Sequence, residues 1–221
     1  MKKVGAGGCR PLFFRNSSCY RFKAVFWPAD RRIDSWKYRR QIRDIQEGEK
    51  MSLKTVYHPY FKIGAAVPAK AFYDARAQEA LLCQYDSFTC ENEMKPQHLL
   101  DEEENRRNPA AHDRCPAVSF QGIRVALDFA RENGMKMRGH TLVWHNQTPR
   151  WFFTESYSDR EDAPLVDRET MLARLEGYIR SVLCFVQEEY PGIIYAWDVV
   201  NEAVEDGALR RSWWTETVGE D

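Results

Sequence analysis

Long apolar stretches alternate along this chain with segments in which apolar residues recur every three or four positions. The stretch from Ile193 to Val200 is almost unbroken in apolar and β-branched residues, as in a parallel strand that is covered on both faces. Before it, a helical pattern opens at Asp167 and closes at Pro191-Gly192. Its apolar positions are Leu172, Leu175, Ile179, Val182 and Val186. The pattern therefore predicts a helix, a turn and a strand.

The same alternation runs upstream of this unit. The predicted strands are 63–67, 86–90 and Met135–Trp144, and the predicted helices are 69–83 and a segment from a Ser119 cap to a stop at Asn133-Gly134. These repeated steps of strand and helix predict an α/β fold with a mostly parallel sheet. The sheet is either an open doubly wound one or a (β/α)8 TIM barrel that is truncated after about four to five βα units.

Length and composition fit a truncated barrel. The chain has 221 residues, of which 43% are hydrophobic and 13% are aromatic, and this is enough to bury a core. A complete barrel takes roughly 250 residues, so we expect part of the barrel to be missing from this sequence.

The net charge of −1 hides an uneven distribution of charged residues. Residues 1–50 contain 13 of the 32 Lys and Arg residues but 5 of the 33 Asp and Glu residues, so the rest of the chain is acidic. We predict a basic, poorly ordered extension over 1–50 rather than a nucleic-acid-binding arm, because its aromatic residues follow no amphipathic period. We expect Met51 to be the natural first residue and the barrel segment to occupy 51–221.

Signals for export, membrane insertion and metal binding are weak in this sequence. Met1-Lys2-Lys3 is not followed by an apolar run of about 7 to 15 residues, and no stretch is long enough to span a membrane. A cytoplasmic location is therefore expected. The six cysteines form no CxxC pair and no metal-ligand spacing, which predicts reduced, mostly buried thiols without a disulfide framework or a zinc site.

Three polar clusters lie where predicted strands end. They are Glu91-Asn92-Glu93-Met94-Lys95, Gly139 to Gln147, and Asn201-Glu202. Taken singly, such a charged loop is usually solvated, and a histidine or tryptophan in a strand usually packs in a core. The carboxyl ends of barrel strands lie on one rim, where barrel enzymes carry their active-site groups, so the three clusters together predict a site.

Alternation along the strands predicts which side chains can meet. His140 and Trp144 fall on one face of their strand and His145 on the other, so we do not expect the two histidines to share a metal. Asp198 falls on the same face as Glu202, and we expect it to be a buried partner within the site.

The motifs TCENEMKP, GHTLVWHNQTP and WDVVNEA, in this order, resemble three motifs of glycoside hydrolase family 10, the endo-β-1,4-xylanases. The resemblance covers about residues 60–221 and implies a (β/α)8 barrel, of which this chain would be the N-terminal half. It implies xylan or xylo-oligosaccharide as the substrate and neither a metal nor another cofactor. Residues 1–50 resemble nothing in the family.

Carried over residue by residue, the resemblance makes Glu202 the general acid/base. The residues that it implies for sugar binding are Glu91, Asn92, Lys95, His140, Trp144, Gln147 and Asn201. The family nucleophile is a glutamate on the seventh strand, which would lie beyond Asp221. Retaining hydrolysis needs this second carboxylate about 5 Å from the first. The resemblance therefore implies that the chain alone is inactive and lacks the C-terminal half of its barrel.

Alternatives stay open at the level of sequence. The chain is either an incomplete retaining xylanase, or a complete product that is an inactive half-barrel relic or a weak sugar-binding fragment. Among enzymes, another retaining glycosidase of the same barrel clan would share the strand end at Asn201-Glu202. It would not be expected to carry the motifs around Glu91 and Gly139 together.

Overall fold

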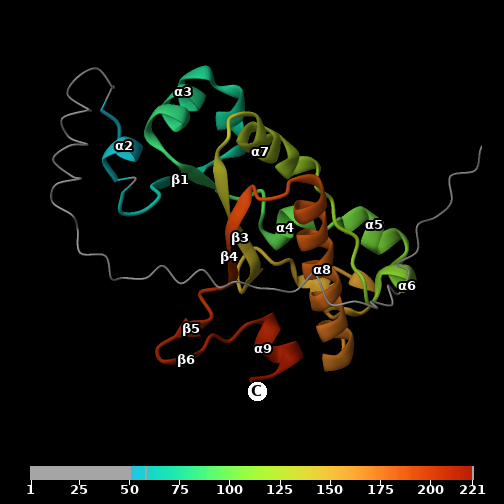
Figure 1. Ribbon diagram of the computed structural model, residues 1–221. Helices are drawn as coiled ribbons and strands as arrows, with labels where there is room; N and C mark the ends of the chain where they lie inside the picture. Colours follow the sequence, from blue (N-terminus) through green and yellow to red (C-terminus); the bar gives the residue numbers. More distant parts are fainter. Residues whose placement is uncertain (1–50, 58, 221) are drawn as a thin grey trace, which may run out of the picture. The chain divides into compact units, whose positions relative to one another are not determined.

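A four-stranded parallel sheet forms the centre of the fold (Figure 1). The computed structural model describes residues 51–57 and 59–220, so the predictions made for residues 1–50 lie outside the described residues. The strands are β1 (Gly64–Val67), β2 (Ser87–Cys90), β3 (Lys136–Trp144) and β4 (Ile194–Asn201), and they neighbour one another in chain order. Each strand lies within one residue of its predicted bounds, which confirms the parallel α/β sheet.

Helices and a hairpin connect and follow the strands. The α-helices are α2 (Leu53–Tyr57), α3 (Ala75–Gln84), α4 (Pro96–Leu99), α5 (Glu102–Arg107), α6 (Pro109–His112), α7 (Gln121–Glu132), α8 (Arg168–Glu189) and α9 (Trp213–Val218). The 3-10 helices are η1 (Ala69–Tyr73), η2 (Arg150–Phe153) and η3 (Glu155–Tyr157), and the hairpin is β5 (Val204–Glu205) with β6 (Ala208–Leu209). In Figure 1, the long helices α7 and α8 lie on the same side of the sheet. Within the described part of the chain, every helix is too short or too polar to traverse a lipid bilayer.

The cap of α8 agrees with the prediction, whereas that of α7 does not. Asp167 caps α8 by accepting a hydrogen bond from the Thr170 amide at 2.8 Å, and this bond holds the pKa of the Asp167 carboxyl below its usual value. Helix α7 begins after Phe120, which makes no side-chain cap. The predicted Ser119 cap is wrong, because the N-cap position falls one residue later, at Phe120. The Ser119 amide donates to the Leu99 carbonyl at 2.8 Å and so ties this segment to the end of α4.

The weak helical pattern predicted at 69–83 is divided into two helices. The Asp74 side chain accepts hydrogen bonds from the amides of Arg76 and Ala77 at 2.8 and 3.0 Å. This cap starts α3 in a new direction, and the preceding turn remains the separate 3-10 helix η1.

Aromatic rings fill the core between the sheet and its helices. Phe72 of η1, Phe88 of β2 and Phe129 of α7 are buried, and their ring centres are 5.2 to 6.2 Å apart. Tilted and edge-to-face ring pairs of this kind add to the stability gained by burying their area. The cluster packs η1 and α7 against β2 and so holds this strand in place.

The cysteines are less buried than predicted. The four described cysteines are free, and Cys90 of β2 is buried, whereas Cys83 and Cys115 are partly exposed and Cys184 is exposed. The prediction of mostly buried thiols is wrong for these four, because Cys83 and Cys184 lie on helix surfaces and not in the sheet. Burial raises the pKa of the Cys90 thiol, so this group stays protonated at neutral pH.

Strand β4 is not covered on both faces by the described residues. Tyr195, Val199 and Val200 are 47%, 54% and 54% exposed. The prediction from the unbroken apolar run is therefore not met within residues 51–57 and 59–220. The reason is position, since β4 pairs with β3 and lies at the edge of the described sheet. Exposed apolar strands at an edge tend to pair with further chain.

Strands β3 and β4 approach each other closely at a glycine. A Cβ atom added to Gly139 would lie 2.3 Å from Cε3 of Trp197, its register partner on β4. Only a residue without a side chain leaves room for this indole ring. Because His140 follows directly, the close approach also positions the polar residues at the end of β3.

Arg174 of α8 is fully buried beneath the segment that precedes the helix. Its guanidinium donates to the carbonyls of Asp113, Phe152 and Thr154 at 2.8 to 3.0 Å and to the Asp113 carboxylate at 2.7 Å. It also lies 4.0 Å from the ring centre of Tyr157. A buried charge needs this many partners, because removing it from water without them costs several kcal/mol.

We predict that Gly139→Ala lowers the free energy of unfolding by about 1 to 3 kcal/mol, because the added methyl group must displace the Trp197 ring. Urea unfolding followed by circular dichroism measures the change. Gly122→Ala in α7 is the matched control, since nothing lies within 4 Å of the added Cβ. That variant should be stabilised by up to about 1 kcal/mol, because alanine favours helix more than glycine does. Equal losses in both variants would refute the clash.

We predict that Arg174→Met lowers the free energy of unfolding by about 3 kcal/mol or more, because buried acceptors lose their donor. Urea unfolding again gives the value. Arg180→Met on the same helix is the control, since Arg180 is 56% exposed and forms a surface pair with Glu176. A pair of this kind contributes at most about 1 kcal/mol. A loss for Arg174→Met no greater than that of the control would contradict the assigned role.

Candidate active site

The ends of β2, β3 and β4 bring the three predicted polar clusters to one region. These strands are parallel and adjacent, so their carboxyl ends face the same way. The register pairs Trp144 at the end of β3 with Asn201 at the end of β4. Glu202 follows Asn201 directly, and Glu91 follows the last residue of β2.

Lys95 is the centre of a polar group at these strand ends. It is 7% exposed, and its ammonium donates to Asn92 Oδ1 at 3.0 Å and to Gln147 Oε1 at 2.6 Å. The Gln147 amide nitrogen donates in turn to Asn92 Oδ1 at 3.3 Å. The ammonium also lies 4.9 Å from the ring centre of Trp144. One buried cation thus joins Asn92, in the loop after β2, to Trp144 and Gln147 at and after the end of β3.

A hydrogen bond joins the ends of β3 and β4. The Trp144 indole N–H donates to Glu202 Oε2 at 3.0 Å. The Glu202 side chain is 53% exposed, and its backbone has a φ of 51°, in the left-handed region. The carboxyl group is therefore oriented by the neighbouring strand and remains accessible to a molecule from solution.

His145 lies close to the same carboxyl group. Its Nδ1 is 3.9 Å from Glu202 Oε2, and its ring centre is 5.8 Å from that of Trp144. His145 and Glu202 both follow the last residue of their strands, so the alternation of faces within β3 and β4 does not determine this contact. His145 Nδ1 is buried without a hydrogen-bond partner in the described structure.

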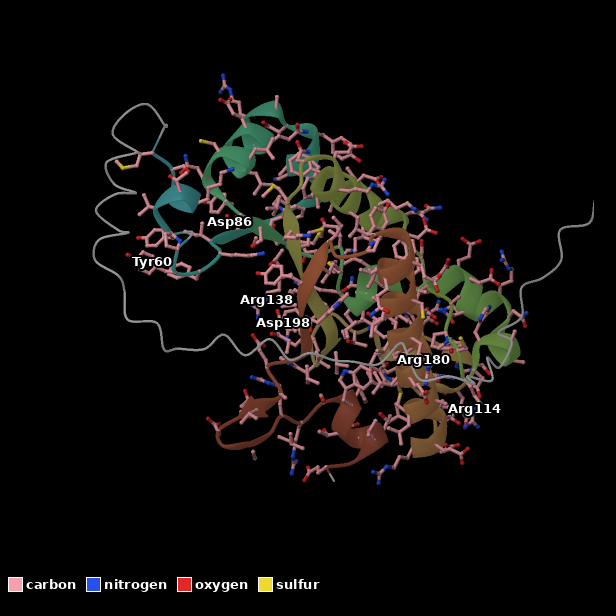
Figure 2. All side chains as sticks on the ribbon, viewed as in Figure 1. Tyr60, Asp86, Arg114, Arg138, Arg180 and Asp198 are labelled. Atoms are coloured by element: carbon pink, nitrogen blue, oxygen red, sulfur yellow. The ribbon has the colours of Figure 1, made fainter. Side chains whose placement is uncertain are left out.

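Asp198 links His140 to Arg138. It accepts a hydrogen bond from Arg138 Nε at 2.9 Å, and His140 Nδ1 lies 3.0 Å from its second carboxylate oxygen. Figure 2 shows Arg138 and Asp198 pointing toward each other from neighbouring strands. The Asp198 side chain is 19% exposed, so the expected partner within the site is partly and not fully buried. The His140 ring centre is 6.1 Å from that of Trp144, so this group continues into the site.

A cavity of about 430 Å³ opens beside this ion pair. Glu91, His140 and Asp198 line it together with Lys62 and Tyr195. The structure therefore brings Glu91 and His140 to one cavity, while the Lys95 ammonium lies over the ring of Trp144. Among the described residues, no three His, Cys, Asp or Glu side chains are grouped so that they could hold a metal ion.

Glu93 has a structural function that the sequence did not reveal. Its carboxylate accepts hydrogen bonds from the amides of Ala69 at 2.8 Å and Asn92 at 3.2 Å. These bonds fix the loop after β2 against the start of η1. No local sequence pattern predicts this contact, because Ala69 and Glu93 are distant in sequence and only the fold brings them together.

Comparison with known proteins identifies relatives of this sequence. The family described as glycosyl hydrolase family 10 matches residues 52–221. Endo-1,4-beta-xylanase B of Butyrivibrio fibrisolvens is 57% identical over 171 residues, which cover 77% of this chain and 27% of that protein. Endo-1,4-beta-xylanase A of Thermotoga maritima is 40% identical over 193 residues, which cover 86% of this chain and 16% of that protein.

Solved structures also match this fold. The N-terminal endo-1,4-beta-D-xylanase 10B of Clostridium thermocellum, complexed with xylohexaose, has a TM-score of 0.69 and 33% identity, over 77% of this chain and 35% of that one. An intracellular xylanase from Thermoanaerobacterium saccharolyticum has a TM-score of 0.65 and 34% identity, over 78% of this chain and 50% of that one. This chain thus spans half or less of the length of these four proteins.

Proposed function

Because the chain belongs to glycosyl hydrolase family 10, we propose that it is the N-terminal part of a retaining endo-β-1,4-xylanase that hydrolyses xylan or xylo-oligosaccharides. Family membership and the solved relatives imply a (β/α)8 barrel, to which the four parallel strands would contribute the first half. The observation that carries the proposal is the Trp144–Glu202 hydrogen bond beside the buried Lys95 group. It presents one oriented carboxyl group next to an aromatic face and several fixed polar groups.

Glu202 is the general acid/base in this proposal. With Oε2 engaged by the Trp144 indole, Oε1 would carry the proton to the glycosidic oxygen as the bond to the anomeric carbon breaks. A second carboxylate would then hold that carbon as a covalent intermediate. In the second step Glu202 would take a proton from a water molecule that attacks the anomeric carbon and frees the second carboxylate. The configuration at this carbon is thereby retained.

The groups around Glu202 suit a neutral sugar. The Trp144 ring offers an apolar surface for the C–H face of a pyranose, and the polar atoms of Asn92, Lys95 and Gln147 can pair with hydroxyl groups at its edge. His140 and Glu91 line the adjoining cavity, and Asn201 lies opposite Trp144 in register. We assign all seven predicted sugar-binding residues to this site, namely Glu91, Asn92, Lys95, His140, Trp144, Gln147 and Asn201.

The C-terminal half of the barrel is the expected partner of this chain. A retaining reaction needs a second carboxylate about 5 Å from Glu202, and in this proposal a strand outside the present sequence supplies it. The exposed side chains of Tyr195, Val199 and Val200 on β4 support this, because further barrel strands would cover them.

We predict that the 221-residue chain alone shows no turnover of a chromogenic xylobioside above background. Turnover should appear when the chain is fused to the part of the Butyrivibrio relative that follows its matching 171 residues. In the active fusion, Glu202→Gln should lower kcat/KM on xylan about a hundredfold or more, because proton transfer to the leaving group is lost.

Glu205→Gln is the control for this experiment, since Glu205 lies in the hairpin next to the site and is 53% exposed. It should change kcat/KM less than about threefold, as expected for a surface charge. Robust turnover by the chain alone would overturn the need for a second half. Full activity of Glu202→Gln in the fusion would overturn its assignment as general acid/base.

We predict that Lys95→Met weakens the binding of xylotriose to this chain at least about tenfold, because a charged donor to the sugar and to Asn92 and Gln147 is lost. Titration followed by ¹⁵N-labelled NMR signals of the Trp144 indole measures the dissociation constant. Lys70→Met, at an exposed lysine of η1, is the control and should bind as the parent chain does. Equal binding by both variants would exclude the Lys95 group from the sugar site.

A further inference from the structure

Glu202 has a backbone conformation that needs an explanation. Its φ of 51° lies in the left-handed region, where a residue with a long side chain is held only by its surroundings. This conformation determines the direction in which the Cα–Cβ bond leaves the end of β4. Whatever fixes the backbone at Glu202 therefore also fixes the carboxyl group on the Trp144 indole.

The hairpin that follows Glu202 returns the chain to this residue. Asp206 and Gly207 have φ values of 50° and 83°, as in the tight turns that suit two-residue hairpins. The turn pairs Val204 with Leu209, and so brings Arg210 back beside the start of β5. The Arg210 amide donates to the Ala203 carbonyl at 2.8 Å.

The Arg210 side chain contacts the backbone of Glu202 itself. Its Nε donates to the Glu202 carbonyl at 3.2 Å, and its Nη1 donates to Glu205 Oε1 at 2.7 Å. The Arg210 side chain is 25% exposed, so these two bonds are partly shielded from water. The rigid guanidinium can make both bonds at once, whereas a lysine ammonium would lack this fixed fork.

We propose that Arg210 is a positioning residue for Glu202. By holding the Glu202 carbonyl, it fixes the peptide plane that follows the left-handed residue and keeps the carboxyl group on the Trp144 indole. The functional meaning rests on the proposed function of Glu202 as general acid/base, but the contact itself can be tested without turnover.

The test uses ¹⁵N NMR of the 221-residue chain to measure the chemical shift of the Trp144 indole N–H and its rate of hydrogen exchange with solvent. Trp144→Phe assigns the signal, and Glu202→Ala gives the position and exchange rate of an indole without this acceptor. Arg210→Met should move the signal toward the Glu202→Ala position and raise its hydrogen exchange with solvent about tenfold, as expected when one hydrogen bond is lost.

Two matched variants separate positioning from general support of the hairpin. Arg211→Met removes an exposed neighbouring charge, and Glu205→Gln weakens only the ion pair of the hairpin. Both should leave the exchange rate within about twofold of the parent chain, because a surface charge contributes little. An unchanged indole signal in folded Arg210→Met would overturn the proposal. So would an equal effect of Arg211→Met.

If Arg210→Met loses the amide signals of β3 and β4, that variant is not folded, and Arg210→Lys then tests the proposal in its place. It preserves a charge for Glu205 but cannot make both bonds in the original geometry, so faster exchange of the Trp144 indole is expected. An indole as protected as in the parent chain would overturn the proposal. Because the signal needs no catalysis, failure of Glu202 as a catalyst would appear in activity assays and not in this measurement.

Discussion

The parallel register of β3 against β4 is the constraint on which the site depends. It sets Trp144 opposite Asn201, so the indole N–H reaches the carboxyl group of the following residue, Glu202. A shift by one residue would turn every side chain of the strand to its other face. Gly139 makes this register possible, because its missing side chain leaves room for Trp197 where the two strands approach. The geometry of the candidate site at the strand ends thus depends on the packing of Gly139 against Trp197, several residues earlier in these strands.

The strands and long helices could be predicted because their signals are local and redundant. Asp167 caps α8 as predicted, and Val182 and Val186 are buried as predicted. The first half of the predicted apolar face is wrong, because Leu172 is 42% exposed and the buried positions there are Met171, Arg174 and Tyr178. The short helices between β2 and α7 were not predicted. Helix α4 starts at Pro96 and α5 is capped by Asp101, so each depends on one or two residues and not on a periodic pattern. Ser119 shows the limit of such single-residue signals, because the N-cap position falls at Phe120 and the Ser119 amide is bonded to the Leu99 carbonyl of another element.

The candidate site was predictable in outline for a different reason. Polar clusters at the ends of parallel strands must share a rim, so the sequence places Glu91, Trp144 and Glu202 near one another without any knowledge of contacts. The details required the fold. His145 lies 3.9 Å from the Glu202 carboxyl, a contact between two residues beyond the strand ends that the alternation of faces could not predict. The hairpin has a local signal in Asp206-Gly207, but the contact that Arg210 makes with the Glu202 carbonyl has none.

The contacts of Glu202 explain which part of the proposed reaction the described residues can supply. The Trp144 indole N–H holds one carboxyl oxygen of Glu202 at 3.0 Å, and the Lys95 ammonium lies against the same indole ring. These contacts orient a carboxyl group that can pass a proton to a leaving oxygen in one step and take a proton from water in the next. Retaining hydrolysis also needs a second carboxylate about 5 Å away that bonds to the anomeric carbon. In the proposed function the C-terminal half of the barrel supplies that group, so the oriented acid/base and the nucleophile would come from different halves of one barrel.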